Sequence, residues 1–341
     1  MRALVWHGPE RMSVEEVPEP EPGPGEVLLV PEAVGICGSE VEGFLGHQAN
    51  RTPPLIMGHE FAGRITAAGA DVPSDWVGRR AAVNPLVPDP GARAGLENLG
   101  TRRELLGVHR PGGFADAVAV PAAQLRPLPD GADARLGALA EPLANGVHAV
   151  RIAQAGAEGD ASGSAVILGA GPIGLMVLQE TRLAEVRWIG SLELQPDRRA
   201  AAAAAGAHVT CASADEARAA VREATDGEGV DFVIDAVGAV ETRRLAVELV
   251  RPGGCALMLG LASDTTPLEF HHVIRSEITV RGSYAYTAAD YDVALEHLLD
   301  GRVGLGELEP VGPLDGGPAA FTELARGASS RVKVFIAPDA A

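Results

Sequence analysis

A glycine-rich loop between a strand-like and a helix-like segment constrains the fold of this chain more than any other feature. The loop lies in SAVILGAGPIG, residues 164–174, and from there to about residue 281 short apolar runs alternate with alanine-rich helical segments. The candidate strands are 165–168, 186–192, 208–210, 230–234, 255–259 and 278–281. Pro196 and Gly206 are suited to begin and close one intervening helix. This alternation predicts an α/β fold with a Rossmann-type, doubly wound parallel sheet of six strands.

The loop has the spacing of a dinucleotide-binding fingerprint. Gly169, Gly171 and Gly174 occupy its three glycine positions, with Pro172 and Ile173 between the last two. The first glycine permits a tight turn, the second lets the backbone approach a pyrophosphate, and the third lets helix and strand pack closely. The N–H groups at the helix N-terminus can then bind phosphate. We expect a nicotinamide dinucleotide here, and the alternative is that the glycines only shape a turn.

Acidic and basic residues after the next strand bear on the choice of coenzyme. Glu193 ends that strand at about the expected offset of 20 residues, where a carboxylate binds the ribose hydroxyls and repels a 2′-phosphate. NAD is therefore favoured over NADP. Arg198 and Arg199 follow closely and could pair with such a phosphate, so NADP stays open. Asp235, at the end of a later strand, either lines the ligand site or caps a helix.

The segments on either side of this region have a different texture. The first 140 or so residues contain short strand-like pieces, such as 26–33 and 61–67, interrupted by Pro and Gly. After residue 281, a helix at about 288–299 and a strand at 332–336 do not extend the alternation. We therefore expect a β-rich domain formed by residues 1–145 and 283–341, with the nucleotide domain, 146–282, inserted into it.

Three kinds of metal-binding side chain occur in the β-rich part. Cys37 in GICGSE offers a thiolate, His59 in GHE an imidazole, and Glu60 or Glu141 a carboxylate. A catalytic zinc typically takes three protein ligands and leaves one position open. Each residue alone is more often structural, but together with a nucleotide fold they favour a zinc site. Ser39 could accept the proton of an alcohol there, or it could simply stabilise the loop through a backbone hydrogen bond.

Composition excludes several classes of partner. The formal charge is −18 without a basic run, which argues against nucleic acid or an anionic membrane surface as a partner. No stretch approaches the ~18 apolar residues of a membrane span, and MRALVWHGPE has no signal-like apolar segment, so we expect a cytoplasmic protein. Besides Cys37 the cysteines are Cys211 and Cys255, which are expected in the core.

Five motifs, GICGSE, GHEFAGRI, AEPLANGVHA, VILGAGPIG and SSRVKVFI, resemble the zinc-dependent medium-chain dehydrogenases, nearest the polyol (sorbitol-type) and threonine dehydrogenase branches. The resemblance extends over nearly the whole chain. It implies a GroES-like β-rich catalytic domain, a Rossmann coenzyme domain, and homodimers or homotetramers. It also implies zinc ligands at Cys37, His59 and Glu60, with Glu141 near the metal. Lys333, the only lysine, would lie near the coenzyme.

The chain departs from this family pattern in two places. Many relatives carry four cysteines that bind a structural zinc, but residues 84–107 contain none, so we expect one catalytic zinc and no structural zinc. Polyol-type relatives commonly have a histidine where this chain has Glu42, five residues after the metal cysteine. Glu42 could replace that histidine in a proton relay, His47 could do so, or the relay could be impaired.

The leading functional prediction is an NAD-dependent, zinc-containing oxidoreductase that interconverts a secondary alcohol and a ketone. A polar substrate is expected: a polyol, sugar, aminocyclitol or hydroxy amino acid. Phe44, Phe270 and Tyr284 could line its pocket, although at 4% aromatic content core positions are favoured. The alternatives are a zinc-free quinone or enone reductase on the same fold, and a non-catalytic NAD-binding protein.

Overall fold

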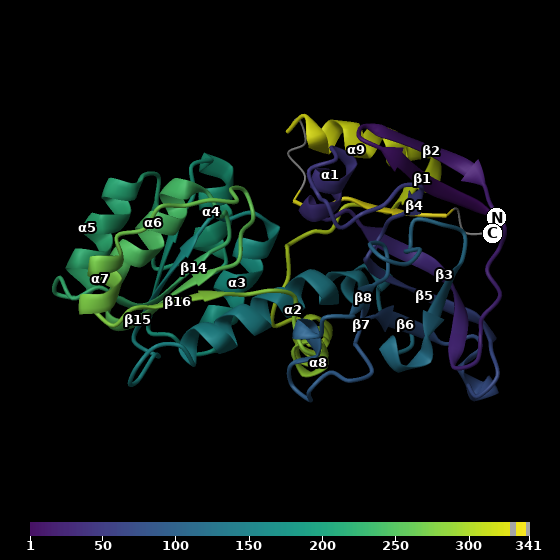
Figure 1. Ribbon diagram of the computed structural model, residues 1–341, viewed down its shortest axis with the longest axis horizontal. Helices are drawn as coiled ribbons and strands as arrows, with labels where there is room; N and C mark the ends of the chain where they lie inside the picture. Colours follow the sequence, from purple (N-terminus) through teal and green to yellow (C-terminus); the bar gives the residue numbers. More distant parts are fainter. Residues whose placement is uncertain (328–331, 339–341) are drawn as a thin grey trace. The chain divides into compact units, whose positions relative to one another are not determined.

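The computed structural model describes residues 1–327 and 332–338 (Figure 1). The chain forms two compact units: unit 1 contains Met1–Pro142 and Thr287–Ala341, and unit 2 contains Leu143–Tyr286. The boundaries expected from the sequence, after residues 145 and 282, stay predictions of where the domains divide. None of the described helices combines the length and the apolar character that a bilayer span requires.

Unit 2 is built on one sheet of six parallel strands in the order β13-β12-β11-β14-β15-β16. The strands are β11 (Ser164–Leu168), β12 (Trp188–Leu192), β13 (Val209–Cys211), β14 (Val230–Asp235), β15 (Val250–Met258) and β16 (Thr279–Gly282). All six residues of β14 are buried, as expected for a central strand covered on both faces. The strand order reverses between β11 and β14, which is the doubly wound arrangement of a nucleotide-binding sheet. The predicted six-stranded Rossmann sheet is confirmed.

Helices connect these strands. They are α3 (Pro172–Leu183), α4 (Pro196–Ala204), α5 (Ala214–Ala224), α6 (Val240–Leu249) and α7 (Phe270–Arg275). Pro196 is the first residue of α4, and Gly206, with a φ of +110°, follows its end, as predicted. The hydroxyl of Ser213 accepts a hydrogen bond from the Glu216 N–H and caps α5. Helices α5 and α6 pack against β12–β13 and β14–β15 respectively.

Unit 1 is mostly antiparallel β structure. One sheet has the order β2-β1-β4, a larger sheet has β10-β6-β5-β3-β18-β17 with β9 also paired to β3, and β7 pairs with β8. The strands are β1 (Arg2–Gly8), β2 (Arg11–Glu16), β3 (Glu26–Gly35), β4 (Leu55–Ile56), β5 (Glu60–Ala68), β6 (Arg80–Val83), β7 (Leu86–Val87), β8 (Glu104–Leu105), β9 (Val118–Pro121), β10 (Leu125–Pro127), β17 (Gly312–Pro313) and β18 (Phe335–Ala337). The helices are α1 (Gly38–Phe44), α8 (Ala288–Leu299) and α9 (Gly317–Ala325), while α2 (Ala134–Gln154) runs from unit 1 into unit 2.

Strand register brings three distant segments together at one end of β3. Gly35 pairs with Glu60 of β5 on one side and with Phe335 of β18 on the other, both antiparallel. Residues 37–40, 59–60 and 333 therefore meet there. The C-terminal strand is shorter than predicted and begins at Phe335. The first part of SSRVKVFI, residues 329–331, lies outside the described residues.

Aromatic and sulfur-containing side chains test the expected core. Phe44 is buried and packs on Phe321 with ring centroids 5.7 Å apart, so its core position is confirmed. Cys211 and Cys255 are buried, as predicted. For the other two candidates the core expectation is wrong: Phe270 is 64% exposed and Tyr284 41% exposed. Phe270 opens the short helix α7, in which none of the residues is buried.

Residues 84–107, which we call the lobe, contain the small β7–β8 pair and are held by one carboxylate. Asp89 Oδ1 accepts hydrogen bonds from the Gly91 N–H (3.0 Å) and from Arg102 Nη2 (3.0 Å). Its Oδ2 accepts from the backbone N–H and the Nε of Arg102, both at 3.2 Å. The backbone donor of Gly91 and the guanidinium of Arg102 lower the pKa of Asp89 below its ordinary value. Both oxygens of this carboxylate are fully used within the lobe.

Candidate functional site

Cys37, His59 and Glu60 form a compact group of atoms that could bind a metal ion, which we call the metal-binding group. The thiol sulfur, one imidazole nitrogen and one carboxylate oxygen all lie within 4.8 Å of one another. Cys37 directly precedes α1, and His59 directly precedes β5. His59 and Glu60 are buried, while Cys37 is partly exposed, so the group is open on its thiol side. One sulfur, one nitrogen and one oxygen donor suit zinc and leave a coordination position free for an exogenous oxygen.

Glu40, which the sequence analysis did not single out, organises this group. Its side chain is fully buried, and Oε1 accepts hydrogen bonds from the Gly58 N–H (2.7 Å), the His59 N–H (3.1 Å) and His59 Nδ1 (2.9 Å). Its Oε2 accepts from the Cys37 N–H at 3.1 Å. Because Glu40 occupies Nδ1, Nε2 of His59 is left for a metal. The signal in the sequence is an acidic residue at the third position of a helix, where it can reach back to the residue before the helix.

Charges are strongly coupled around His59. Burial lowers the pKa of His59, but the carboxylate of Glu40 and the sulfur of Cys37 outweigh burial and hold that pKa well above its ordinary value. Burial likewise opposes ionisation of Glu40, yet His59 and more distant Arg51 keep the pKa of Glu40 below its ordinary value. The protein without metal thus favours a protonated His59, and a metal must displace that proton.

Lys333 forms an ion pair with Glu60 in which both side chains are almost completely buried. Burial opposes the charge of Lys333, but Glu60 and Cys37 raise its pKa above the ordinary value. The pair fits against β3 because residue 35 is a glycine: a Cβ there would collide with the Glu60 carboxylate and the Lys333 side chain. Glu60 Oε1 has no hydrogen-bond partner among the described residues. A buried carboxylate oxygen without a partner is the kind of atom that a metal satisfies.

The predicted proton-relay residues lie on α1 and just after it. The Ser39 hydroxyl donates to the Cys37 sulfur at 3.3 Å, so it faces the metal-binding group. Glu42 and His47 are exposed and joined by a hydrogen bond of 2.8 Å between Oε2 and Nδ1. The two alternatives considered for the relay are therefore members of one exposed pair.

Glu141 is not part of the compact metal-binding group found among the described residues. It is buried in α2, which continues through the next residue, Pro142. Its negative charge is close enough to add to the effect of burial in raising the pKa of Tyr291, on α8, above the ordinary value. Glu141 and Tyr291 therefore share one buried environment in unit 1.

The glycine loop of unit 2 has the geometry that its fingerprint predicts. Gly169 has a φ of +92°, which a residue with a side chain rarely adopts. A Cβ at Gly174 would collide with the carbonyl of Gly169, so the helix could not pack so closely on the strand. A Cβ at Gly171 would meet nothing within 4 Å, which leaves the loop open on that side. Pro172 and Ile173 form the first turn of α3, whose N-terminus follows the loop.

Glu193 lies beside this loop. One carboxylate oxygen accepts from the Ala170 N–H and the other from the Gln195 N–H, each at 2.9 Å. Arg199 donates to the carbonyls of Glu193 and Leu194, whereas Arg198 is exposed and makes no such contact in the described structure. Asp235 is fully buried and accepts hydrogen bonds from the Val237 and Gly238 N–H groups before α6 and from the Thr242 hydroxyl in its first turn, so it stabilises the start of this helix.

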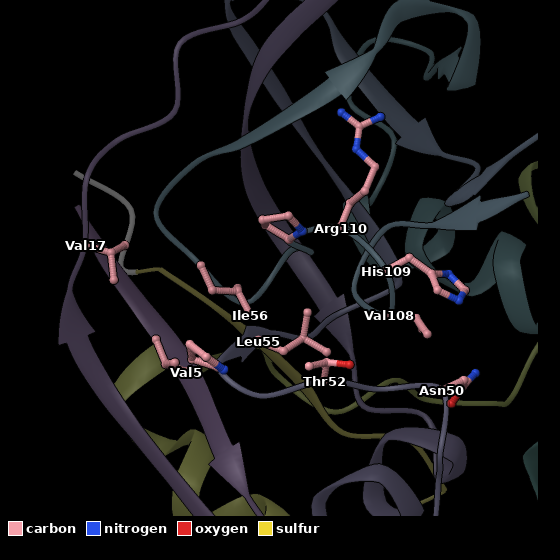
Figure 2. A pocket seen from close by; sticks show the side chains of 11 residues that line it. Val5, Val17, Asn50, Thr52, Leu55, Ile56, Val108, His109 and Arg110 are labelled. Carbon is pink, nitrogen blue, oxygen red and sulfur yellow. The ribbon is translucent and has the colours of Figure 1, made fainter. Parts of the chain in front are cut away.

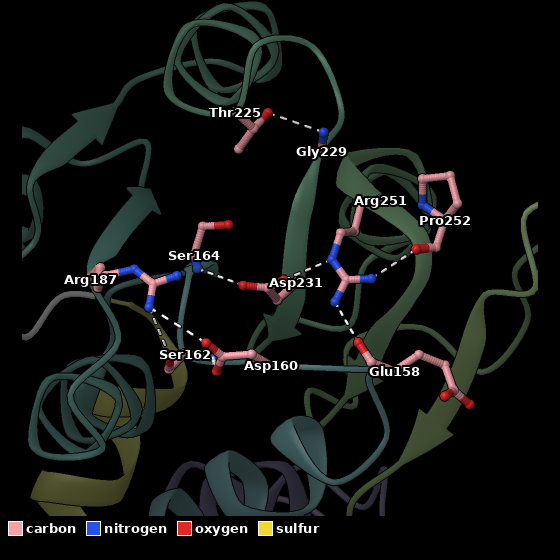
Figure 3. Close-up of polar contacts among 10 residues, drawn as sticks. All are labelled: Glu158, Asp160, Ser162, Ser164, Arg187, Thr225, Gly229, Asp231, Arg251 and Pro252. Carbon is pink, nitrogen blue, oxygen red and sulfur yellow. Dashed lines mark hydrogen bonds and ion pairs between the residues drawn. The ribbon is translucent and has the colours of Figure 1, made fainter.

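A polar hollow of about 440 Å³ lies at the opposite, amino ends of the strands in unit 2 (Figure 3). Arg251 donates to Asp231 at 2.7 Å and to two carbonyls, and Asp231 also accepts from the Ser164 N–H. Arg187 is held by Ser162 and Asp160. The arginines therefore have partners within the protein. Ligands of such sheets bind at the carboxyl ends, where Gly169 and Glu193 lie, so this network is structural.

Family models match both parts of the chain. An alcohol dehydrogenase GroES-like domain matches residues 23–130, and a zinc-binding dehydrogenase domain matches residues 172–300. The GroES-like and Rossmann combination expected from the resemblance is confirmed.

Three curated relatives cover most of the chain. (R,R)-butanediol dehydrogenase of Bacillus subtilis is 32% identical over 84% of this chain and 85% of its own. D-arabitol-phosphate dehydrogenase of Enterococcus avium is 31% identical over 96% and 94%. L-threonine 3-dehydrogenase of Streptomyces avermitilis is 33% identical over 97% and 98%.

Solved structures agree with this relationship. A protein described as a zinc-binding dehydrogenase from Sinorhizobium meliloti, bound to NADP, is 30% identical, covers 99% of both chains and has a TM-score of 0.87. A short chain alcohol dehydrogenase of Escherichia coli complexed with NADH is 25% identical over 99% of both chains, also with a TM-score of 0.87. The chain therefore belongs to the zinc-type medium-chain dehydrogenases of the polyol branch, oxidoreductases that interconvert alcohols and ketones on polar substrates.

Proposed function

We propose that this protein is an NAD-dependent dehydrogenase with one catalytic zinc, and that it oxidises a secondary alcohol of a polyol, sugar or hydroxy acid, or reduces the matching ketone. One observation carries the proposal. Cys37, His59 and Glu60 offer three different donor atoms within 4.8 Å, and Glu60 keeps a buried oxygen without a partner among the described residues.

Cys37, His59 and Glu60 are the proposed ligands. Glu60 is preferred to Glu141 as the direct ligand because Glu141 is outside the compact group. Zinc at this position supplies Lewis acidity, which lowers the pKa of an alcohol hydroxyl. Glu40 fixes the orientation of His59, and Lys333 limits the movement of Glu60 by pairing with its other oxygen. No second zinc is proposed, because the lobe contains no cysteine. Its distant residues are joined instead by the hydrogen bonds between Asp89 and Arg102.

The proton path begins at Ser39. Its hydroxyl contacts the Cys37 sulfur and is only partly buried, so it would be available to accept the proton of a substrate hydroxyl at the open side of the group. The proton then passes to the exposed Glu42–His47 pair and from there to water. A carboxylate and an imidazole are both groups that can accept and pass on a proton, which suits the relay position.

The loop from Gly169 to Gly174 and the N-terminus of α3 would hold the pyrophosphate of the coenzyme, and Glu193 would bind its ribose. A bound NAD would supply the hydride acceptor. NAD is preferred to NADP because the Glu193 carboxylate is beside the loop, 2.9 Å from the Ala170 N–H. Arg198 is the residue that would support NADP, since its guanidinium is exposed.

Relatives named for butanediol and for arabitol phosphate support the proposal that a neutral or an anionic polyol is the substrate. The proposed partners are thus small polar alcohols and ketones, with neither nucleic acid nor membrane involved. We also propose a homodimer or homotetramer, as the family resemblance implies, and a cytoplasmic location, as the composition suggests. Light scattering of the purified chain would measure the oligomeric state directly.

Metal analysis followed by a substrate panel tests the proposal. We expect about one zinc per chain and zinc-dependent formation of NADH, measured by absorbance, with at least one polyol, sugar alcohol or hydroxy acid. Removal of zinc by a chelator should abolish that activity, and zinc should restore it. Full activity with no metal bound would support the quinone-reductase alternative, and tight NAD binding without hydride transfer would support a non-catalytic role.

A further inference from the structure

Arg51 is a buried cation without a partner. Its residue surface is only 6% exposed, and its guanidinium makes neither a hydrogen bond nor an ion pair with any described residue. Arginine is rarely buried in this way, because removing its charge from water without a countercharge is costly. The position is also maintained by packing: a Cβ at Gly43 of α1 would lie 2.8 Å from Arg51 Cδ and 2.9 Å from Nε.

The charge of Arg51 acts on Glu40, but the carboxylate of Glu40 already has other partners. Arg51 lowers the pKa of Glu40 through its charge, but the two residues form no ion pair. The oxygens of Glu40 instead accept from Cys37, Gly58 and His59. Arg51 therefore adds a positive charge near the metal-binding group that no described side chain neutralises.

His109 adds a second donor within the electrostatic reach of Arg51. Its Nδ1 accepts from the Leu105 N–H at 3.0 Å, so the neutral ring carries its proton on Nε2. Partial burial, together with Arg103 and Arg51, keeps the pKa of His109 below its ordinary value. Figure 2 shows His109 and Asn50 at the same end of a pocket of about 470 Å³ in unit 1. Asn50 is the neighbour of Arg51 in the chain.

The position suits recognition of one end of a substrate whose other end reacts. Gly43, on which Arg51 packs, is six residues beyond Cys37, or about 9 Å along α1. This separation is similar to the length of an extended polyol with a phosphate or carboxylate at its end. A local positive site is also needed for an anionic substrate, because the chain as a whole carries a formal charge of −18 and repels anions.

We infer that Arg51, with His109, forms an oxyanion subsite that binds a phosphate monoester or a carboxylate at the end of the substrate remote from the reacting carbon. The planar guanidinium can bind either group through two parallel hydrogen bonds. This inference rests on the proposed function and specifies the substrate class of the same site. It narrows the substrates from polar alcohols in general to polyol phosphates or sugar acids.

The test uses the full, zinc-loaded chain and matched pairs of substrates: a polyol with and without a terminal phosphate, and a polyol against its aldonate. Arg51→Met should lower kcat/KM for the anionic partner about 10- to 100-fold, and change the neutral partner less than about threefold. Arg51→Lys keeps the charge but cannot form the two parallel hydrogen bonds of a guanidinium. It should therefore give an intermediate loss of kcat/KM for the anionic partner. Arg93→Met, at an exposed arginine of the lobe, removes the same charge and should change neither partner.

Binding of inorganic phosphate, measured by calorimetry without turnover, gives an independent readout. Wild-type protein and Arg93→Met should bind it, and Arg51→Met should not. Equal losses on both partners, or unchanged phosphate binding in Arg51→Met, would overturn the subsite. Zinc-dependent oxidation of neutral alcohols alone would reject the subsite and leave the proposed function intact. Arg51-dependent phosphate binding without any hydride transfer would support the subsite and reject the proposed dehydrogenase function. The better partner in wild type identifies phosphate or carboxylate.

Discussion

The metal-binding group and the lobe both join segments of unit 1 through a buried carboxylate, but the two carboxylates differ in what they leave open. In the lobe, Asp89 accepts four hydrogen bonds from Gly91 and Arg102. In the metal-binding group, Glu60 pairs with Lys333 through one oxygen and has no described partner for the other. A satisfied carboxylate holds a fold together, whereas an unsatisfied one indicates a ligand. Five predictions test that contrast.

Replacement of Cys37 should have the largest effect. Cys37→Ala removes the only sulfur of the group, so we expect loss of bound zinc and a fall in kcat of at least about 10³-fold. NAD affinity, measured by fluorescence titration, should stay nearly the same because the glycine loop is in unit 2. Cys255→Ala, at a buried cysteine of unit 2, is the control and should keep its zinc. Full activity in Cys37→Ala would refute the metal mechanism.

Replacement of Glu40 by glutamine should have the second largest effect. The amide keeps the size of the side chain but weakens its hold on His59 Nδ1, so zinc affinity should fall about 10- to 100-fold. Competition with a chromogenic chelator measures it. Glu42→Gln removes the same charge two residues along α1, at an exposed position, and should change zinc affinity less than about twofold. Equal effects of the two variants would mean that Glu40 acts only through overall charge.

Zinc affinity should also depend on pH. Zinc requires neutral His59, whose pKa in the metal-free protein is raised by Glu40 and Cys37 against the effect of burial. Below that raised pKa, the fall in zinc affinity should steepen by a further factor of about ten for each pH unit, because His59 must then also lose a proton as zinc binds. In Glu40→Gln the pKa of His59 drops, so the fall should begin at lower pH. Chelator competition at a series of pH values would detect it, and coincident profiles would contradict the role of Glu40.

Glu193 is an intermediate case between a satisfied and an unsatisfied carboxylate, because each of its oxygens already accepts one backbone hydrogen bond. If it also binds the coenzyme ribose, Glu193→Ala should weaken NAD about tenfold and reduce the preference for NAD over NADP. Kinetics with both coenzymes would measure this. Arg198→Ala should have little effect on NAD and should weaken NADP. An unchanged preference in Glu193→Ala would place that carboxylate with Asp89 among the purely structural ones.

Asp89→Asn should have the smallest effect, a modest decrease in Tm with no change in zinc content or kcat. Because the pKa of Asp89 is lowered in the folded protein, its contribution is present above the unfolded pKa of about 3.9 and is lost as pH falls through the folded pKa. The Tm difference between wild type and variant should therefore be present at pH 7 and disappear in acid. Loss of zinc in Asp89→Asn would connect the lobe to the metal-binding group.

The sequence predicted the elements whose signals are local. Alternating apolar runs gave the six strands of unit 2, and short motifs identified Cys37, His59 and Glu60 before their convergence was visible. Contacts between distant segments were not predictable in this way. The Lys333–Glu60 pair depends on the register of β18 and β5 on either side of Gly35, and the isolation of Arg51 depends on which carboxylates are already occupied.

The burial of Lys333 has a practical consequence, because it is the sole lysine of the chain and its side chain is 6% exposed. Amine-directed reagents should spare position 333 in the folded protein, where the ammonium is buried and paired with Glu60. Labelling at that position would then be a direct signal that β18 has separated from β3. Lys333 therefore serves as a built-in chemical probe for local unfolding next to the metal-binding group.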